Sequence, residues 1–180
     1  MALYHFSEDP TIALFRPHVA RTSAIRDEAL VWAIDDWHAP MYCVPRDCPR
    51  VCFWAGRNTT LEDRELWLPD PAPRFVMVVE TSWLERMRAT RVYRYTMPEA
   101  SFAPLDTSHG TYISRETVTP VGVEPVGDLF AAIASANVQL RDSSRMGPLW
   151  KRLHSGSTLA RSGIRLLNAA GYPQEFREAE

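Results

Sequence analysis

Short apolar runs separated by polar turns recur along the whole chain. Tyr93, Tyr95 and Met97 alternate with Arg94 and Thr96, and this period of two indicates a strand with one buried face. The other runs are short and bounded by turn residues, which is also typical of strands. The pattern predicts strands over residues 3–7, 30–34, 50–54, 74–80, 91–97, 110–114, 118–123 and 138–141.

Other segments carry helix signals instead. Residues 59–62 (TTLE) and 82–85 (SWLE) fit the S/T-x-x-E capping box, in which side chain and backbone satisfy each other's free groups. An alanine-rich run follows Gly127 and Asp128, and Pro148 stands where the first turn of a helix tolerates proline. These signals predict helices over about 60–67 and 83–89, from residue 129 to near Asn137, and over 146–154.

Strands and helices mix without a regular βαβ alternation, which favours an α+β fold with mixed or antiparallel sheets. Pro40, Pro45 and Pro49 divide residues 35–50 into a short helix or turn and an extended crossing, and residues 98–110 are expected to form a loop. The sequence has no internal repeat and no linker long enough to separate two domains. We therefore expect one domain over residues 1–171 and a polar tail over 172–180.

Composition and charge exclude several classes of protein. The chain has 180 residues, of which 46% are hydrophobic and 23% charged, as in globular proteins. The net charge of -2 argues against a surface that coats nucleic acid. No apolar run approaches the roughly 18 residues that span a bilayer, and no secretory signal precedes the first predicted strand. We expect a cytoplasmic protein with no nucleic-acid or membrane partner.

The three cysteines stand at C-x4-C-x3-C spacing with His38 upstream, a set that superficially offers zinc ligands. The spacing is loose and interrupted by proline, so we expect Cys43, Cys48 and Cys52 to be reduced, free of metal and part of the core or of turns. An enzyme that uses Cys48 with His38 is a weaker alternative. Pro49 leaves no helix N-terminus to lower the pKa of that thiol.

The first predicted strand presents Tyr4, His5, Phe6 and Ser7. Successive side chains of a strand point to opposite faces, so His5 and Ser7 share one face and Tyr4 and Phe6 the other. We expect an interior strand of an antiparallel or mixed sheet, with a polar His5 side and an apolar Tyr4 side.

The chain resembles an uncharacterised bacterial family known only as a domain of unknown function. The resemblance covers nearly the full length and includes segments such as LYHFSEDP, PRDCPR and VEPVGD. The matching stretches are residues 3–10, 31–35, 38–40, 45–50, 83–87, 112–116, 123–128 and 162–165.

A more distant resemblance is to small ADP-ribosyltransferases, including the rifamycin-modifying type. Those enzymes have a Tyr-His-Gly-Thr strand, an aromatic strand, an R-[IV]-Y strand and a late strand, for which residues 4–7, 31–34, 91–95 and 114–124 are the counterparts. Phe6 replaces the usual glycine and Ser7 the threonine. The resemblance implies an ADP-ribosyltransferase-like fold, NAD as the substrate, and transfer of its ADP-ribose group to an acceptor.

Cleavage of the nicotinamide–ribose bond creates a cation similar to that of glycoside cleavage, which a carboxylate stabilises. Under the resemblance, His5 would hold the ribose, and Trp32 or Tyr42 would form a wall for the nicotinamide. Glu80, Glu116 and Glu124 each lie near a strand end, and Glu124 is preferred. The expected catalytic residues are His5 and Glu124, and the expected cofactor-binding residues are Tyr4, Ser7, Trp32, Tyr42, Arg46 and Arg50. We expect His5, Ser7, Trp32 and one of the three glutamates to line one cleft.

Structural roles remain open for the same residues. His5, Trp32 and Tyr42 would serve equally in a core, and Arg46 with Asp47 would serve as a turn brace. The alternative function is a non-catalytic protein that binds a nucleotide or small acid through Arg46, Arg50 and His5. Neither a P-loop nor a Rossmann glycine pattern nor a G-x-S-x-G elbow occurs in the sequence.

Overall fold

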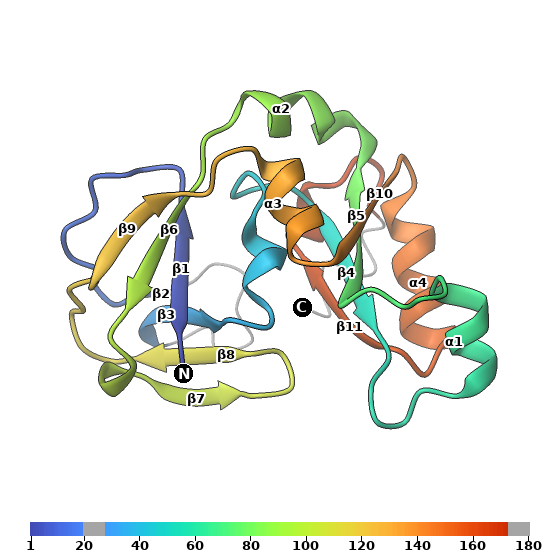
Figure 1. Cartoon of the computed structure of the whole chain (residues 1–180), viewed down its shortest axis with the longest axis horizontal. Coiled ribbons are helices and arrows are strands. Elements are labelled where there is room, and N and C mark those ends of the chain that lie inside the picture. Colours follow the sequence, from blue (N-terminus) through green and yellow to red (C-terminus); the bar gives the residue numbers. More distant parts are fainter. Residues whose placement is uncertain (20–27, 173–180) are drawn as a thin grey trace. The chain divides into compact units, whose positions relative to one another are not determined.

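Strand β1 (Leu3–Ser7) lies inside an antiparallel sheet in this computed structural model, which describes residues 1–19 and 28–172 (Figure 1). The chain divides into two compact units. Among the described residues, unit 1 consists of Met1–Arg46 and Thr90–Leu129, and unit 2 of Asp47–Ala89 and residues 130–172. Each unit is therefore assembled from separate stretches of sequence.

The sheet of unit 1 is antiparallel throughout and has the order β7-β8-β3-β1-β6-β9. Strand β1 pairs with β3 (Ala29–Asp35) on one side and with β6 (Tyr93–Met97) on the other. The short β2 (His18–Val19) pairs with β3, and two 3-10 helices accompany the sheet, η1 (Ala39–Tyr42) and η3 (Glu99–Ser101). The remaining strands are β7 (Ala103–Asp106), β8 (Thr111–Ser114) and β9 (Gly122–Pro125).

One face of this sheet carries the core of unit 1, and the segment after β1 covers it. The Tyr95 hydroxyl donates to the carbonyl of Asp9 (2.6 Å) and accepts from the amide of Ile12 (3.1 Å). Phe15 pairs with Val118 through an isolated bridge. The buried members of this core are Leu3, Phe15, Val31, Ala33, Tyr95, Met97 and Val118.

Unit 2 holds a mixed sheet of order β10-β5-β4-β11. Strands β5 (Phe75–Glu80) and β10 (Val138–Ser143) are parallel, whereas β4 (Arg50–Trp54) pairs antiparallel with β5 and with β11 (Ala160–Ile164). The helical segments of this unit are α1 (Leu61–Trp67), η2 (Thr81–Trp83), α2 (Leu84–Ala89), α4 (Met146–Gly156) and η4 (Leu166–Asn168), while α3 (Leu129–Ser135) begins at the last residue of unit 1.

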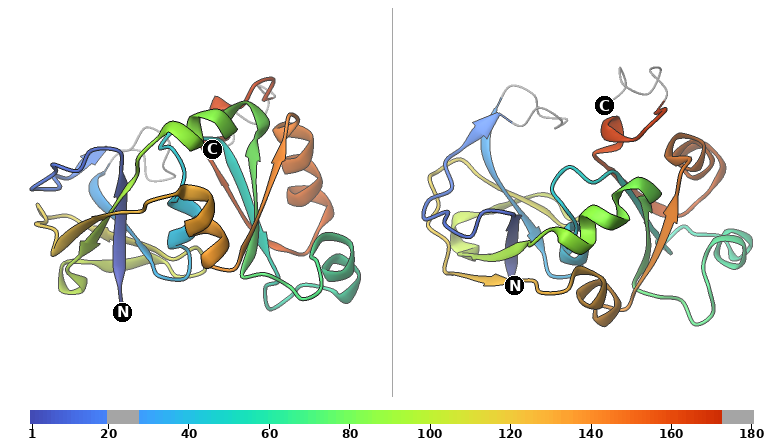
Figure 2. Two further views of the ribbon diagram at one scale, coloured as in Figure 1. Left: turned by 45° about the horizontal axis from the view of Figure 1, so that its top comes forward. Right: turned by 90° about the horizontal axis from the view of Figure 1, so that it is seen from above.

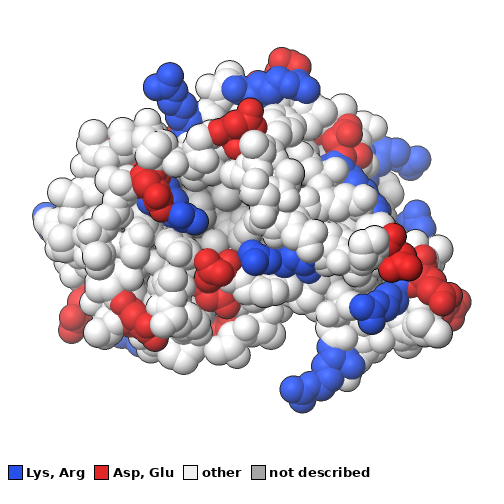
Figure 3. Space-filling view, in the orientation of Figure 1, with Lys and Arg blue, Asp and Glu red and all other residues white. Residues whose placement is uncertain are grey.

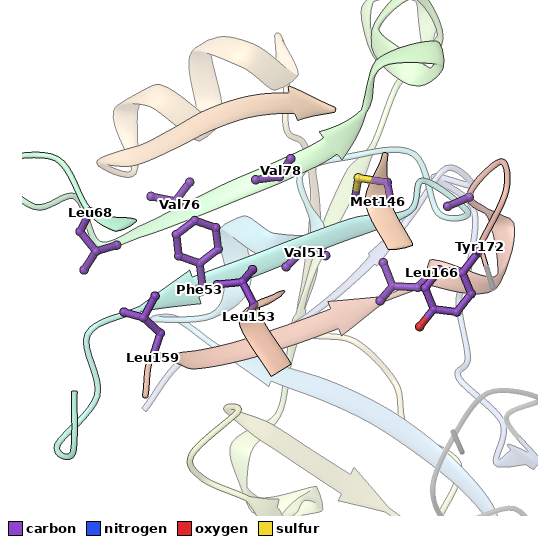
Figure 4. Close-up of a cluster of buried hydrophobic side chains, with 11 residues drawn as sticks. Val51, Phe53, Leu68, Val76, Val78, Met146, Leu153, Leu159, Leu166 and Tyr172 are labelled. Atoms are coloured by element: carbon purple, nitrogen blue, oxygen red, sulfur yellow. The ribbon is translucent and has the colours of Figure 1, made fainter. Parts of the chain in front are cut away.

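Helix α4 lies along the sheet of unit 2 in every view (Figures 1 and 2). Every residue of β4 and β5 is buried, which explains why these strands read as unbroken apolar runs rather than as an alternation. On one face, side chains of β4 and β5 pack against Met146 and Leu153 of α4, both 0% exposed (Figure 4). Leu159, Leu166 and Tyr172 close the same core.

The predicted α+β class is confirmed, with antiparallel and mixed sheets and short helices. The strands predicted at 3–7 and 50–54 have the bounds of β1 and β4, and the other confirmed elements differ by a few residues at their ends. Helix α1 starts one residue later than the capping box indicated. Thr60, not Thr59, is its N-cap and accepts from the amide of Asp63 (3.2 Å).

Three element predictions were wrong. The expected loop over 98–110 contains η3 and β7, and the strand expected over 118–123 is β9, which begins only at Gly122. Ser82 does not cap a helix but lies within η2, before α2. Strands β2 and β11 were missed. Strand β2 is only two residues long, and the sequence of β11, ARSGI, has no apolar alternation.

The single domain over residues 1–171 stays a prediction. Tyr172, at the start of the expected tail, is 3% exposed and belongs to the core of unit 2, so the packed chain extends at least to this residue. Residues 173–180 of that tail lie outside the described residues.

Charged side chains of both signs are interspersed on the face shown in Figure 3, which carries no extended basic patch. Across the described ranges, no helix has both the length and the apolar character needed to cross a bilayer.

Candidate functional site

The side chains of β1 alternate between the two faces of the unit 1 sheet. Residues directly opposite each other in an antiparallel pair share a face. His5 stands opposite Tyr95 and Ser7 opposite Tyr93, so both lie on the core side, which we call the His5 face. The other side carries Tyr4, Phe6, Trp32, Arg94 and Glu124, and we call it the Tyr4 face.

His5 is half-buried and packs against the core of unit 1. Its ring centroid lies 4.7 Å from that of Phe15, and its Nδ1–H donates to the carbonyl of Trp32 (2.9 Å). Burial lowers the pKa of His5 below 6.5, because desolvation disfavours the charged ring and outweighs the hydrogen bond to Trp32. The imidazole is therefore neutral at pH 7 and bridges β1 to β3 just beyond their last paired residues, Tyr4 and Ile34.

The interior position of β1 and the alternation of its side chains are confirmed, but the expected polarity of the two faces was wrong. Ser7 is 7% exposed, and its hydroxyl accepts from the amide of Asp9 (3.1 Å) to close the turn after β1. The His5 face is the buried one. Because Trp32 lies on the opposite face, the expected cleft lined by His5, Ser7, Trp32 and one of the three glutamates does not form.

On the Tyr4 face, three neighbouring strands place Phe6, Arg94 and Glu124 in one row. Arg94 donates from Nε (3.0 Å) and from Nη2 (2.6 Å) to the same oxygen, Oε1 of Glu124. The guanidinium also lies 4.8 Å over the ring of Tyr4. Burial by itself lowers the pKa of Arg94. The hydrogen bond to Glu124 and the charge of Glu124 raise it by more, so the pKa lies above its usual value and the group is always cationic.

Two more aromatic side chains join this face. Tyr42, at the end of η1, stacks on Phe6 with ring centroids 6.0 Å apart and planes 19° apart. Trp32 shares the face of Ile34 and Tyr4 because it stands two residues before Ile34 on β3. Its indole N–H is buried and has no hydrogen-bond acceptor among the described residues. A buried donor of this kind is costly unless an acceptor reaches it.

The end of β3 anchors the helix that carries Tyr42. Asp35 accepts from both the amide and the Nδ1–H of His38, each at 2.8 Å, and only 7% of the His38 side chain is exposed. Gly110 closes over this pair with a φ of +66°, and a Cβ there would collide with His38 Nδ1 and lie 2.6 Å from Asp35 Oδ1. The dyad therefore requires glycine at position 110, and η1 starts directly after it.

The remaining predicted residues have other partners. Glu80 is 3% exposed, belongs to unit 2 and accepts from the amide of Ala170 (2.7 Å), a structural role. Glu116 is exposed, and its amide donates to Ser114 Oγ (3.2 Å). Arg46 and Arg50 were expected to bind the ligand. Arg46 is exposed, whereas the Arg50 guanidinium is buried in unit 2 and donates to the carbonyl of Cys48 (2.9 Å).

The cysteines are buried free thiols. Desolvation raises the pKa of Cys48 and that of Cys52 to about 12, despite the opposing charge of Arg50. A thiol with such a pKa is a poor nucleophile at pH 7, which argues against the alternative that pairs Cys48 with His38. Among residues 1–19 and 28–172, no group of three or more His, Cys, Asp or Glu side chains could hold a metal ion.

Comparison with known proteins adds a family but no activity. The family described as "Family of unknown function (DUF6886)" matches residues 4–169, which is most of the chain. The chain belongs to DUF6886. The resemblance to a domain of unknown function is thus confirmed for this DUF6886 protein. No curated protein and no solved structure matches it.

Tyr4, Trp32, Tyr42 and Glu124 were predicted as site residues, and in this DUF6886 chain they gather on or against one face. Arg94, Phe6 and the Asp35–His38 dyad were missed. The alternation of Tyr93, Arg94 and Tyr95 did place Arg94 opposite the core. Its contacts with Phe6 and Glu124 depend on the strand order β1-β6-β9, which no local sequence signal reveals.

Proposed function

We propose that the Tyr4 face binds a nucleotide and that NAD is the first ligand to test. The observation that carries this proposal is the row of Phe6, Arg94 and Glu124, flanked by the rings of Tyr4 and Tyr42. Stacked aromatic rings suit the flat face of a base or of nicotinamide, and an arginine suits a phosphate.

The proposal replaces the ligand contacts first expected of His5, Arg46 and Arg50. His5 is packed against Phe15 on the opposite face, and Arg50 is committed to the Cys48 carbonyl inside unit 2. In their place, Arg94 offers a cation that is 39% exposed and already stacked on an aromatic ring. The face thus combines half-buried aromatic area with one accessible positive charge.

Isothermal titration with NAD, ADP and adenosine tests nucleotide binding. Tyr42→Ala should weaken NAD binding by about 5- to 100-fold, because base stacking on an aromatic side chain is worth about 1–3 kcal/mol. His5→Gln, on the opposite face, is the matched control and should leave the affinity within about twofold. The absence of binding by all three ligands to the wild type at millimolar concentration would overturn the proposal.

A second candidate function is NAD-dependent ADP-ribosyl transfer on an ADP-ribosyltransferase-like fold. It is favoured by the carboxylate of Glu124, which shares a face with the aromatic rings. In this reaction the bond between nicotinamide N1 and ribose C1′ breaks and nicotinamide leaves. A new bond joins C1′ to a nucleophilic oxygen or nitrogen of the acceptor, whose proton goes to solvent. Glu124 would stabilise the positive charge that develops on the ribose.

Release of nicotinamide from NAD, followed by chromatography, tests this second function. Glu124→Gln should retain NAD binding while release falls by about 100-fold or more, by analogy with the loss of one electrostatic contact to a transition state. Glu116→Gln removes an exposed carboxylate elsewhere in unit 1 and serves as the control. Equal rates for the wild type and Glu124→Gln would contradict the assignment.

A further inference from the structure

The contact between Arg94 and Glu124 is not a two-oxygen fork, although it occupies the Nε and Nη2 edge of the guanidinium. Arginine binds carboxylates and phosphates best as a fork, with two N–H groups directed to two oxygens. Here Nε and Nη2 converge on the single oxygen Oε1 of Glu124. The Tyr4 ring, 4.8 Å away, supports the guanidinium from one side. Glu124 therefore holds the edge that an anionic ligand would need.

We propose that Glu124 stands in for a phosphate at this subsite, and that the phosphate group of the nucleotide displaces it to form a fork with Arg94. The inference rests on the proposed nucleotide-binding function, and it names both the ligand group that Arg94 recognises and the residue that competes with it. Glu124 then sets specificity, because ligands without an anionic group do not break the pair.

The exposure of the two partners makes the exchange easy. The Arg94 side chain is 39% exposed and that of Glu124 is 56% exposed, so solvent screens their attraction. Pairs of this kind contribute little to stability, and a phosphate with two oxygens and a larger charge competes well for the same two donors. After displacement, the Glu124 carboxylate can turn to water at little cost because it stands on the edge strand β9, where every residue is exposed.

The competing role of Glu124 predicts a gain of binding on mutation, which a merely structural ion pair does not. Glu124→Gln should tighten ADP binding by about three- to tenfold, because it removes the competitor and its repulsion of phosphate. Adenosine, which has no phosphate, should bind both proteins equally. Arg94→Gln should weaken ADP binding by about tenfold or more and leave adenosine unchanged.

Glu85→Gln provides a control with the same change in net charge. It removes the acidic partner of another exposed ion pair, Arg88–Glu85, on α2 of unit 2. This variant should bind ADP like the wild type, which separates the local competition from a general change in charge. An ADP affinity of Glu124→Gln equal to or weaker than that of the wild type overturns the inference, as does an equal gain for adenosine.

Titration of the wild type with pyrophosphate, followed by the NMR signal of the Arg94 Nε–H, separates the inference from the proposed function. If pyrophosphate moves the Arg94 signal, and if it does so at lower concentration in Glu124→Gln, the anion subsite is supported even if no nucleoside part binds. Binding of ADP and adenosine with equal affinity, together with an unmoved Arg94 signal, supports nucleotide binding and rejects the subsite. Absence of every one of these effects rejects both.

Discussion

At the scale of single residues, polarity in the sequence was a poor guide to exposure. His5 and Ser7 made one side of β1 look polar, yet both side chains meet the core of unit 1. His5 satisfies its Nδ1–H at the Trp32 carbonyl, and Ser7 satisfies its hydroxyl at the Asp9 amide. A buried polar group is tolerated once it is hydrogen-bonded. Those partners come from another strand or from the turn after β1, and the alternation of side chains along a strand does not predict them.

The half-buried imidazole of His5 makes the stability of the protein depend on pH. The pKa of His5 is lowered in the folded state by desolvation, so below 6.5 the unfolded chain takes up a proton that the folded chain resists. This contribution to the free energy of unfolding is complete above that value and is lost as pH falls, at a rate of at most about 1.4 kcal/mol per pH unit. Urea denaturation between pH 7.5 and 5.5 should show this slope.

Two variants assign that slope to its residue. His5→Gln keeps a donor for the Trp32 carbonyl but does not titrate, so its stability should change less over the same range of pH. His154→Gln removes an exposed histidine on α4 of unit 2 and is the control, which should keep the slope of the wild type. Parallel curves for His5→Gln and the wild type would show that another group is responsible.

At the scale of elements, most strands and helices could be predicted from periodicity and caps, while the strands that were missed lacked those signals. Strand β11 contains arginine, serine and glycine and was not recognised, although it completes the sheet of unit 2. Strand β7 follows η3, contains Pro104 and is exposed along most of its length. Local pattern does not reveal such edge strands, because neighbouring strands rather than their own side chains define them.

Three glycines separate the cost of a left-handed backbone from the cost of a clash with the Asp35–His38 dyad. Gly110 combines a positive φ with contact to the Asp35–His38 dyad, Gly127 has a φ of +81° with open space around it, and Gly122 has open space and no positive φ. We expect the loss of stability on substitution by alanine to fall in that order. Gly127→Ala should cost about 1–2 kcal/mol for the left-handed backbone, Gly110→Ala clearly more, and Gly122→Ala close to nothing.

Thermal and urea unfolding of the three variants gives the order directly. Because Tyr42 ends η1 and stacks on Phe6, Gly110→Ala should also weaken nucleotide binding at temperatures where it remains folded. A Gly110→Ala protein as stable as Gly127→Ala would mean that the dyad relaxes without cost.

At the scale of the whole molecule, each unit is built from separate halves of the sequence. Residues 1–89 supply the adjacent strands β3 and β1 of one sheet and β5 and β4 of the other. The chain from residue 90 onward supplies the strands on both sides of each pair, β8 and β6 in unit 1 and β10 and β11 in unit 2. Neither the division into units nor this nesting was predicted, because no composition shift or linker marks the crossings.

In each sheet, strands from residues 1–89 lie between strands from the chain after residue 89. This arrangement predicts how the protein responds when it is cut into two fragments. Fragments 1–89 and 90–180 should each lack native tertiary structure, since each leaves strands of both sheets without partners. Mixed together, they should recover the tryptophan near-UV circular dichroism and the dispersed NMR spectrum of the intact chain. A native-like spectrum from 1–89 alone would contradict this expectation.

The same nesting has a consequence during synthesis on the ribosome. The inner pair of each sheet emerges first, with apolar strands such as β4 and β5 that the finished protein buries along every residue. Their outer neighbours follow only later, and β11 is the last of the described strands to be made. A nascent chain therefore carries open strand edges until these outer strands have been made, and pairing with another chain is the chief hazard during that time. Slow elongation would prolong that exposure, so the yield of folded protein should depend on translation speed and on chaperones that shield β4 and β5.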